Sequence, residues 1–223
     1  MKAAISWSAG KDACLAWLRA QEAGLDVRTF VTMQDADGSS KSHALSPDLV
    51  AAQVAALGGQ SLGVPVAARP GAYGETFAAV LSDLVARQHT HMVFGDIDLQ
   101  AHRDWLEPLC QRAGLQAVFP LWHQPRAALA QEIVRRGIQA RLVCVDTQRL
   151  DASFCGAAYD AALLQALPAG VCPCGEDGEF HTVVWNAPGF AQPLALRSLG
   201  QRRIVSTPPL RPTTLVFEQL VLA

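Results

Sequence analysis

The chain has 223 residues, of which half are hydrophobic and 17% are charged, and its formal net charge is −2. This length predicts one medium domain, or one domain with a small appendage. The near-neutral charge argues against a nucleic-acid or membrane-surface partner bound by bulk electrostatics. No apolar run reaches the roughly 18 residues of a membrane-spanning helix. The six cysteines fit reduced thiols, so we expect a cytoplasmic protein.

Apolar periodicity predicts strands and helices that alternate along the first 145 residues. A Ser46-Pro47 pair is typical of a helix start, with proline at the first helical position. This regular alternation predicts a Rossmann-like α/β fold, in which a doubly wound, mainly parallel sheet is built with right-handed crossovers. The expected strands are 2–7, 27–33, 64–68, 91–94, 116–121 and 139–145, and the expected helices are 12–23, 47–57, 73–87, 102–114 and 126–136.

The pattern changes after about residue 150. We expect a helix over 157–167, then a Pro-, Cys- and Gly-rich segment, then strands over 182–185 and 215–222. A boundary near residue 125 would separate a nucleotide-binding domain (1–125) from a smaller C-terminal α+β lobe (126–223).

The first candidate motif is Ser8-Ala9-Gly10-Lys11-Asp12, between the first strand and the first helix. Helix N-termini carry unpaired N–H groups and partial positive charge, so such a turn can bind phosphate. A Walker P-loop is excluded, because it would need glycine in place of Ile5 and Ser or Thr in place of Asp12. The alternative is an ordinary strand–helix turn with a solvated lysine.

The second motif is Gly95-Asp96-Ile97, at the end of the fourth strand. With the strand order 3-2-1-4-5, strands one and four are neighbours at the topological switch point, where ligands bind beyond the carboxyl ends of the strands. Both motifs would then flank one crevice. The alternative is an aspartate that caps the next helix, which stays open for Asp98 above all.

The third motif, on the helix that follows, is formed by His102, Arg103 and Glu107. Their i, i+4 spacing places them on one polar face. Taken alone, such a group is more often a solvated, salt-bridged face than a site.

The fourth motif is the acidic segment Cys172-Pro-Cys-Gly-Glu-Asp-Gly-Glu-Phe-His-Thr182. Loops with this density of functional groups often carry sites. A structural zinc site is disfavoured, because Cys-x-Cys with one histidine is not zinc-finger spacing. A bland acidic surface turn remains an alternative.

Together the motifs resemble the diphthine–ammonia ligases and their bacterial relatives, a branch of the PP-loop ATP pyrophosphatases with an adenine nucleotide alpha hydrolase-like fold. The resemblance covers nearly the whole chain: SWSxGKD at its start, His43, GDI at 95–97, HRxWxExxC at 102–110 and CGEDGEFHT at 174–182. Two positions depart from the usual Ser-Gly-Gly-x-Asp-Ser loop. Ala9 adds a methyl group where the backbone can need a positive φ, and Ala13 lacks a phosphate-binding hydroxyl.

The resemblance implies an enzyme that splits ATP into AMP and pyrophosphate, adenylates a carboxylate and transfers ammonia to it. In the best-known members the acceptor is diphthine, a modified histidine of translation elongation factor two; for this chain we expect a carboxylate-bearing small molecule or modified protein residue. A homodimer stays open. Mg²⁺ is expected to accompany ATP, held by Asp12 and Asp96.

The resemblance also distributes the candidate residues by role. The nucleotide-binding set is Ser6, Ser8, Ala9, Gly10, Lys11, Asp12, Ala13, Gly95, Asp96 and Ile97. The substrate-binding set is His43, His102, Arg103, Glu107, Cys174, Gly175, Glu176, Glu179 and Thr182. The catalytic set is Lys11, Asp12, Glu176, Glu179 and His181, in which the two glutamates and the histidine serve the acceptor and ammonia.

Two other functions stay open. The altered loop favours a nucleotide-binding sensor of the same fold that has lost catalysis. A tRNA-modifying thiolase of the same superfamily usually brings further cysteine pairs or an RNA-binding domain, and neither is evident in the sequence.

Overall fold

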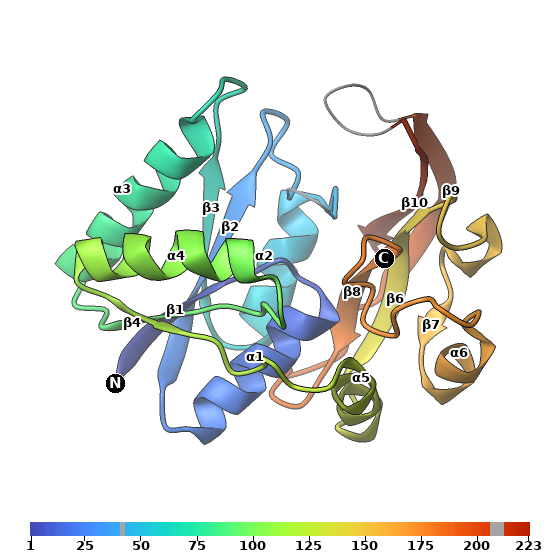
Figure 1. Cartoon of the computed structure of the whole chain (residues 1–223), viewed down its shortest axis with the longest axis horizontal. Coiled ribbons are helices and arrows are strands. Elements are labelled where there is room, and N and C mark those ends of the chain that lie inside the picture. Colours follow the sequence, from blue (N-terminus) through green and yellow to red (C-terminus); the bar gives the residue numbers. More distant parts are fainter. Residues whose placement is uncertain (41–42, 206–211) are drawn as a thin grey trace.

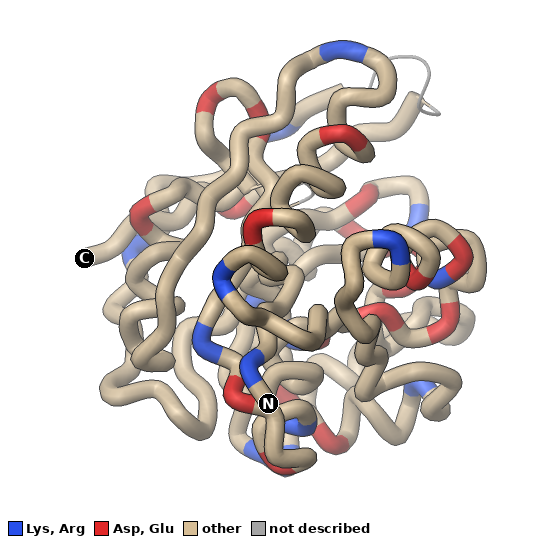
Figure 2. Tube along the Cα trace, turned by 90° about the vertical axis from the view of Figure 1, so that its left-hand side faces the viewer, with Lys and Arg blue, Asp and Glu red and all other residues tan. Residues whose placement is uncertain are grey.

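The computed structural model describes residues 1–40, 43–205 and 212–223. Figure 1 shows two β-sheets side by side, the first with helices on both of its faces and the second with helix α6 (Ala161–Ala166) on its outer side, while α5 (Arg126–Arg135) lies next to α1 (Lys11–Glu22). Charged residues of both signs are interspersed along the tube in Figure 2. Within the described residues, no helix has the length and apolar character needed to cross a membrane.

The first sheet is parallel throughout and has the strand order β3-β2-β1-β4-β5. This confirms the predicted order and the Rossmann-like fold class. The strands are β1 (Lys2–Ser6), β2 (Asp26–Gln34), β3 (Gln60–Pro65), β4 (His91–Val93) and β5 (Gln116–Val118). The ends of β1 and β4 therefore lie next to each other, as expected of a switch point.

Four helices cover the two faces of this sheet: α1 (Lys11–Glu22), α2 (Pro47–Ala56), α3 (Ala72–Ala86) and α4 (Gln100–Ala113). The α2 start is as predicted, because the Ser46 hydroxyl accepts a hydrogen bond from the Leu49 amide and proline occupies the first turn. Leu15 of α1 belongs to one apolar cluster and Phe77 of α3 to another. The helices thus form two layers, one on each side of the sheet.

The second sheet is antiparallel, with the order β7-β6-β10-β9 and with β8 paired to β6. Its strands are β6 (Gln139–Asp146), β7 (Ala158–Tyr159), β8 (Phe180–Asn186), β9 (Leu196–Val205) and β10 (Thr214–Leu222). Its short helices are α5 (Arg126–Arg135), α6 (Ala161–Ala166) and the 3-10 turn η1 (Ala152–Phe154).

Three sequence-based expectations for this region were wrong in part. The alternation suggested that 139–145 continues the parallel sheet, but its partners β8 and β10 come from later in the chain. The helix expected over 157–167 is shortened by β7. Strand β9 was missed because most of its side chains are exposed, which leaves no apolar alternation to detect.

The two sheets are joined at the loop between β1 and α1. The Val184 amide of β8 donates to the Ala9 carbonyl at 3.0 Å, and the Lys11 amide donates to the Thr182 hydroxyl at 3.1 Å. Ile5 of β1 and Val184 also belong to one apolar cluster. The second sheet therefore packs directly on the candidate phosphate-binding turn.

Candidate functional site

The turn between β1 and α1 has an unusual backbone at Ala9. Its φ is +69°, and its side chain is fully buried in the apolar cluster. The buried Gln53 side chain and the Val184 amide both donate to the Ala9 carbonyl, at 3.1 and 3.0 Å. The left-handed conformation expected for this position is therefore confirmed, at a cost of roughly 1 kcal/mol for a non-glycine residue. The Ala9 methyl group points into the core, so it does not obstruct the cleft.

Lys11 is buried, with 2% of its surface exposed. Its ammonium donates to the Cys174 carbonyl at 2.5 Å and to Asp12 Oδ2 at 2.7 Å, and lies over the rings of Tyr159 and Phe180. Burial alone would lower the pKa of Lys11, but Asp12, Cys174 and Glu176 together outweigh it and hold the pKa above its ordinary value. The alternative of a solvated lysine was therefore wrong: this side chain ties α1 to the acidic segment.

Asp12 and Asp96 face the same cavity from α1 and from the end of β4. Asp12 Oδ1 is buried, and none of the described residues donates a hydrogen bond to it. Asp96 Oδ1 lies 2.9 Å from His102 Nδ1. Gly95 permits the close approach, because a Cβ there would lie 3.0 Å from the Ala13 nitrogen. No group of three or more His, Cys, Asp or Glu residues within the described ranges could hold a metal by itself.

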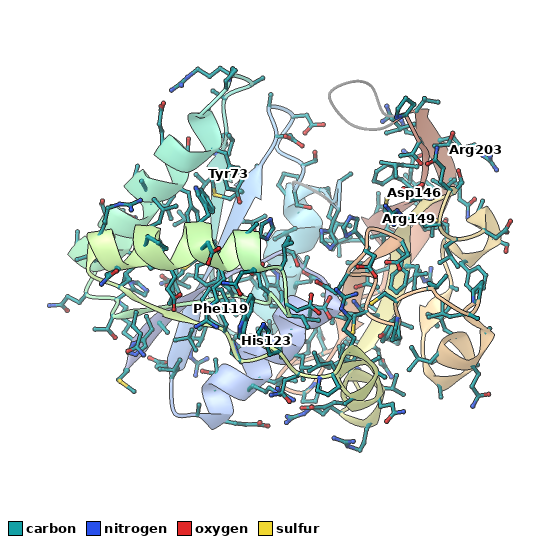
Figure 3. All side chains as sticks on the ribbon, in the orientation of Figure 1. Tyr73, Phe119, His123, Asp146, Arg149 and Arg203 are labelled. Atoms are coloured by element: carbon teal, nitrogen blue, oxygen red, sulfur yellow. The ribbon has the colours of Figure 1, made fainter. Side chains whose placement is uncertain are left out.

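Two adjacent cavities open beyond the carboxyl ends of β1 and β4. The first, of about 400 Å³, is lined by the aromatic side chains of Tyr73, Phe77, Phe94 and Trp105. Tyr73, at the start of α3, is labelled in Figure 3. The Phe77 and Trp105 rings stack with centroids 5.7 Å apart. This lining suits a flat aromatic group.

The second cavity, of about 310 Å³, is polar. It lies between the β1–α1 turn and the acidic segment. The two cavities lie side by side and share four lining residues: Ser6, Ser8, Asp96 and His102. The N-terminus of α1 lies at this cavity, since Lys11, Asp12 and Ala13 all line it. Ala13 therefore places a methyl group on the cavity surface where the usual loop would place a serine hydroxyl.

The two glutamates of the acidic segment have different environments. Glu176 lines the second cavity, and burial together with the Asp12 carboxylate raises its pKa to about 8. Glu179 is 3% exposed, and its two carboxylate oxygens accept the amides of Cys172 at 2.8 Å and Asp177 at 3.0 Å. It faces away from the second cavity, towards Arg149. This geometry favours the bracing alternative for Glu179 over an acceptor-binding role.

The turns of the acidic segment need glycine. Gly175 and Gly178 have φ of +74° and +86°, and a Cβ on Gly175 would lie 2.6 Å from the Phe180 carbonyl oxygen. The segment therefore turns tightly at both glycines. It brings Cys174 and Glu176 to the cavity wall.

Two histidine rings meet at the same wall. His43 and His181 have ring centroids 4.6 Å apart, and both line the second cavity. Burial lowers the pKa of His181 to about 4, so its imidazole is neutral at pH 7. His43 also lines a third cavity, of about 330 Å³, between the 37–47 segment and the β9–β10 hairpin.

Comparison with known proteins assigns the family. Residues 1–117 match the family model described as the diphthamide synthase N-terminal domain, and residues 125–204 match that of the diphthamide synthase C-terminal domain. The chain belongs to the diphthamide synthase family. The resemblance seen in the sequence is thereby confirmed at the level of the family.

Two relatives of the family are named diphthine–ammonia ligase. The protein of Danio rerio is 26% identical over 225 residues, which cover 85% of this chain and 84% of that protein. The protein of Schizosaccharomyces pombe is 30% identical over 98 residues, which cover 42% of this chain and only 16% of that protein.

Two solved structures also overlap with this chain. One is a predicted subunit of tRNA methyltransferase from Methanocaldococcus jannaschii, with 15% identity, a TM-score of 0.47 and coverage of 84% of this chain and 98% of that chain. The other is the U34-tRNA thiolase NcsA from Methanococcus maripaludis, with 13% identity, a TM-score of 0.40 and coverage of 60% and 56%. The strand order described above, not these overlaps, establishes the fold class of this family member.

The three residues of the third motif lie in different environments. His102 lines both cavities, whereas Arg103 and Glu107 are not among the described residues that line them. Arg103 pairs with Glu107 at 3.2 Å, and its guanidinium stacks over Phe119 and Trp122. Phe119 lies beneath α4 in Figure 3. The surface ion-pair alternative fits these two residues better than substrate contact.

Three other candidates support the site mainly through backbone and packing contacts. Ile97 is fully buried, and its carbonyl accepts the His123 amide at 2.7 Å. Gly10 begins α1 in an extended conformation, and a Cβ there would lie 3.1 Å from His43 Nε2. The Thr182 hydroxyl holds the Lys11 amide and also reaches the second cavity.

Two important residues were missed. Gln53 of α2 is fully buried and bonds Trp7, Ala9 and Val184, so it joins both sheets to the turn. Arg126 binds Asp98 and the acidic segment. Gln53 could have been noticed in the sequence, because it is a single glutamine on the apolar face of a predicted helix and such a buried amide needs hydrogen-bond partners. No local pattern distinguishes Arg126 from the other surface arginines.

Proposed function

We propose that this family member is an ATP-dependent ligase that adenylates a carboxylate, releases pyrophosphate and then forms an amide with ammonia. The observation that carries the proposal is the second cavity. It joins the N-terminus of α1 to the Cys174–Glu176 wall, and it adjoins the aromatic first cavity. A nucleotide and an acceptor can therefore lie side by side at this site.

We place the adenine and ribose in the first cavity and the phosphates in the second. The aromatic side chains of Tyr73, Phe77 and Trp105 offer a stacking surface for a purine. The amides and partial positive charge at the N-terminus of α1 favour phosphate beside Ser8 and Ala13.

Asp12 and Asp96 fit Mg²⁺ brought in with ATP. Mg²⁺ typically keeps several waters and takes one or two carboxylates plus phosphate oxygens, and Asp12 Oδ1 is a buried acceptor without a described donor. When bound, the ion would neutralise phosphate charge during adenylation. The ion would also reduce the electrostatic repulsion between these two carboxylates and the polyphosphate in the same cavity.

Glu176 and His181 are suited to the ammonia step. The His181 imidazole is neutral at pH 7, so a ring nitrogen can accept a hydrogen bond from ammonia and orient it for attack on the acyl-adenylate. The Glu176 carboxyl is mostly protonated at pH 7, so a cation that enters the cavity can displace its proton and bind the carboxylate. His43, which lines both the second and third cavities, lies where the rest of an acceptor would emerge.

The names of the relatives suggest diphthine as the acceptor to try first. The test is to incubate the protein with α-labelled ATP, ammonium and elongation factor two carrying diphthine, and to separate the nucleotide products. Factor with the unmodified histidine is the matched control. We expect AMP that depends on diphthine and ammonium. ADP as the product would contradict the proposal.

A second function, that of a nucleotide sensor, is favoured by one observation. Ala13 removes a hydroxyl from the phosphate side of the cavity. Tight ATP binding without acceptor-dependent pyrophosphate release, across a panel of carboxylates, would select the sensor over the ligase.

A further inference from the structure

Arg126, the first residue of α5, contacts two separate segments of the chain. Its Nε and Nη2 donate to the two carboxylate oxygens of Asp98 at 2.7 and 2.8 Å. Its Nη1 donates to Asp177 Oδ2 at 2.9 Å and lies 3.5 Å from Cys172 Sγ. Its backbone carbonyl accepts the Cys174 thiol at 3.1 Å. One residue thus binds the loop after β4 and the acidic segment together.

Both of these segments line the second cavity. The loop after β4 carries Asp96, and the acidic segment carries Glu176. Arg126 is not among the described residues that line the first two cavities. Any effect of Arg126 on the reaction must therefore pass through the walls that it holds.

We propose that Arg126 is a positioning residue that fixes the separation between the ATP side and the acceptor side of the cavity. The inference rests on the proposed ligase function and adds a residue that takes no direct part in the chemistry of that function. Adenylation needs the acceptor carboxylate beside the α-phosphate, and small misplacements of such groups are costly in rate.

The chemistry of the contacts favours positioning over simple stabilisation. A guanidinium binds a carboxylate through two parallel hydrogen bonds and so fixes its orientation, which a lysine ammonium cannot do. The side chains of Arg126, Asp98 and Asp177 are 30%, 33% and 53% exposed. Ion pairs with this exposure contribute little to stability, so geometry is the main expected effect.

Cys172 offers a readout that does not depend on turnover. A hydrogen bond from Cys174, with help from Arg126, lowers the pKa of the Cys172 thiol to about 6. Burial raises the pKa of Cys14, Cys110 and Cys144 to about 12. Arg126 lies 3.5 Å from Cys172 Sγ, so alkylation of the Cys172 peptide as a function of pH, followed by mass spectrometry, reports the arrangement of the acidic segment around this thiol without any need for turnover.

Arg136 provides a matched control. It also lies at an end of α5, is 27% exposed, and bonds Glu22 and Glu132 on the side away from the cavity. We expect Arg126→Lys to lower kcat for pyrophosphate release at least tenfold, with KM for ATP within twofold of wild type. Arg136→Lys should leave both within twofold.

The thiol measurement uses Arg126→Gln, in which the pKa of Cys172 should rise, because the positive charge beside the thiol is lost; in Arg136→Gln it should stay near 6. Equal kcat for the two lysine variants, or an unchanged Cys172 pKa in Arg126→Gln, would overturn the positioning role. A wild-type protein that releases no pyrophosphate with any acceptor would instead remove the ligase function, which the thiol measurement does not assess.

Discussion

Glu179→Gln tests whether the buried glutamate braces the acidic segment. The side chain keeps its size, but its NH₂ group would face one of the two backbone N–H groups from which the carboxylate now accepts a hydrogen bond. Two donors would then meet, and that hydrogen bond would be lost. Hydrogen bonds to charged groups contribute roughly 1.5–3 kcal/mol each, and a buried donor left without a partner adds to the loss. We therefore expect the free energy of unfolding to fall by about 3 kcal/mol, or about 6–12 °C in melting temperature for a chain of this size.

Glu176→Gln is the matched control, three residues earlier in the same segment. Its carboxyl lines the cavity and is mostly protonated at pH 7, whereas in the unfolded chain it would be ionised, so the neutral amide should keep or raise stability while acceptor-dependent turnover falls steeply. Thermal unfolding by circular dichroism and pyrophosphate release per folded molecule separate the two effects. A Glu179→Gln protein with wild-type stability and lost turnover would refute the bracing role and restore the catalytic one.

Three further changes have expected outcomes. Lys11→Met should lower the free energy of unfolding by about 3 kcal/mol in urea titrations, because Asp12 loses its ion-pair partner; unchanged stability would mean that Lys11 is free for phosphate. Ala13→Ser should lower KM for ATP about fivefold, because the new hydroxyl can make a hydrogen bond to phosphate of about 1 kcal/mol. Ala9→Gly should relieve the backbone strain at this position and leave KM for ATP unchanged, because Ala9 does not line the second cavity. The pKa of Glu176 is raised in the folded state, so its contribution to stability is complete below about pH 4.5 and is lost as the pH rises to about 8. Over that window the wild type should therefore lose stability relative to Glu176→Gln. A stability difference between the two proteins that does not change with pH would contradict the raised pKa.

Much of the N-terminal half could be predicted from the sequence. Alternating apolar periods of two and 3.6 residues identified the strands and helices of the first sheet, although the third strand, expected over 64–68, lies at Gln60–Pro65. The strand order was taken from the doubly wound fold class, and the structure has that order. The Gly95 position could be anticipated because a strand end and a helix start meet there, and the structure shows a Cβ would lie within 3.0 Å of the Ala13 nitrogen.

The antiparallel sheet was harder to predict for a physical reason. Strand β6 pairs with β8 and β10, which lie tens of residues further along the chain, and local periodicity carries no information about such partners. The role of Lys11 was missed for a similar reason. Its contacts with Cys174, Tyr159 and Phe180 span about 150 residues or more of sequence, so the lysine looked like a solvated or phosphate-binding side chain.

The most direct test of the central claim is the fate of oxygen in the acceptor carboxylate. If the carboxylate attacks the α-phosphorus of ATP and the amide then forms, one carboxylate oxygen must leave with AMP. The acceptor labelled with ¹⁸O in its carboxyl group should therefore give AMP carrying one ¹⁸O atom per amide formed, detected by mass spectrometry. Unlabelled AMP, or label found in free phosphate, would contradict adenylation of the acceptor.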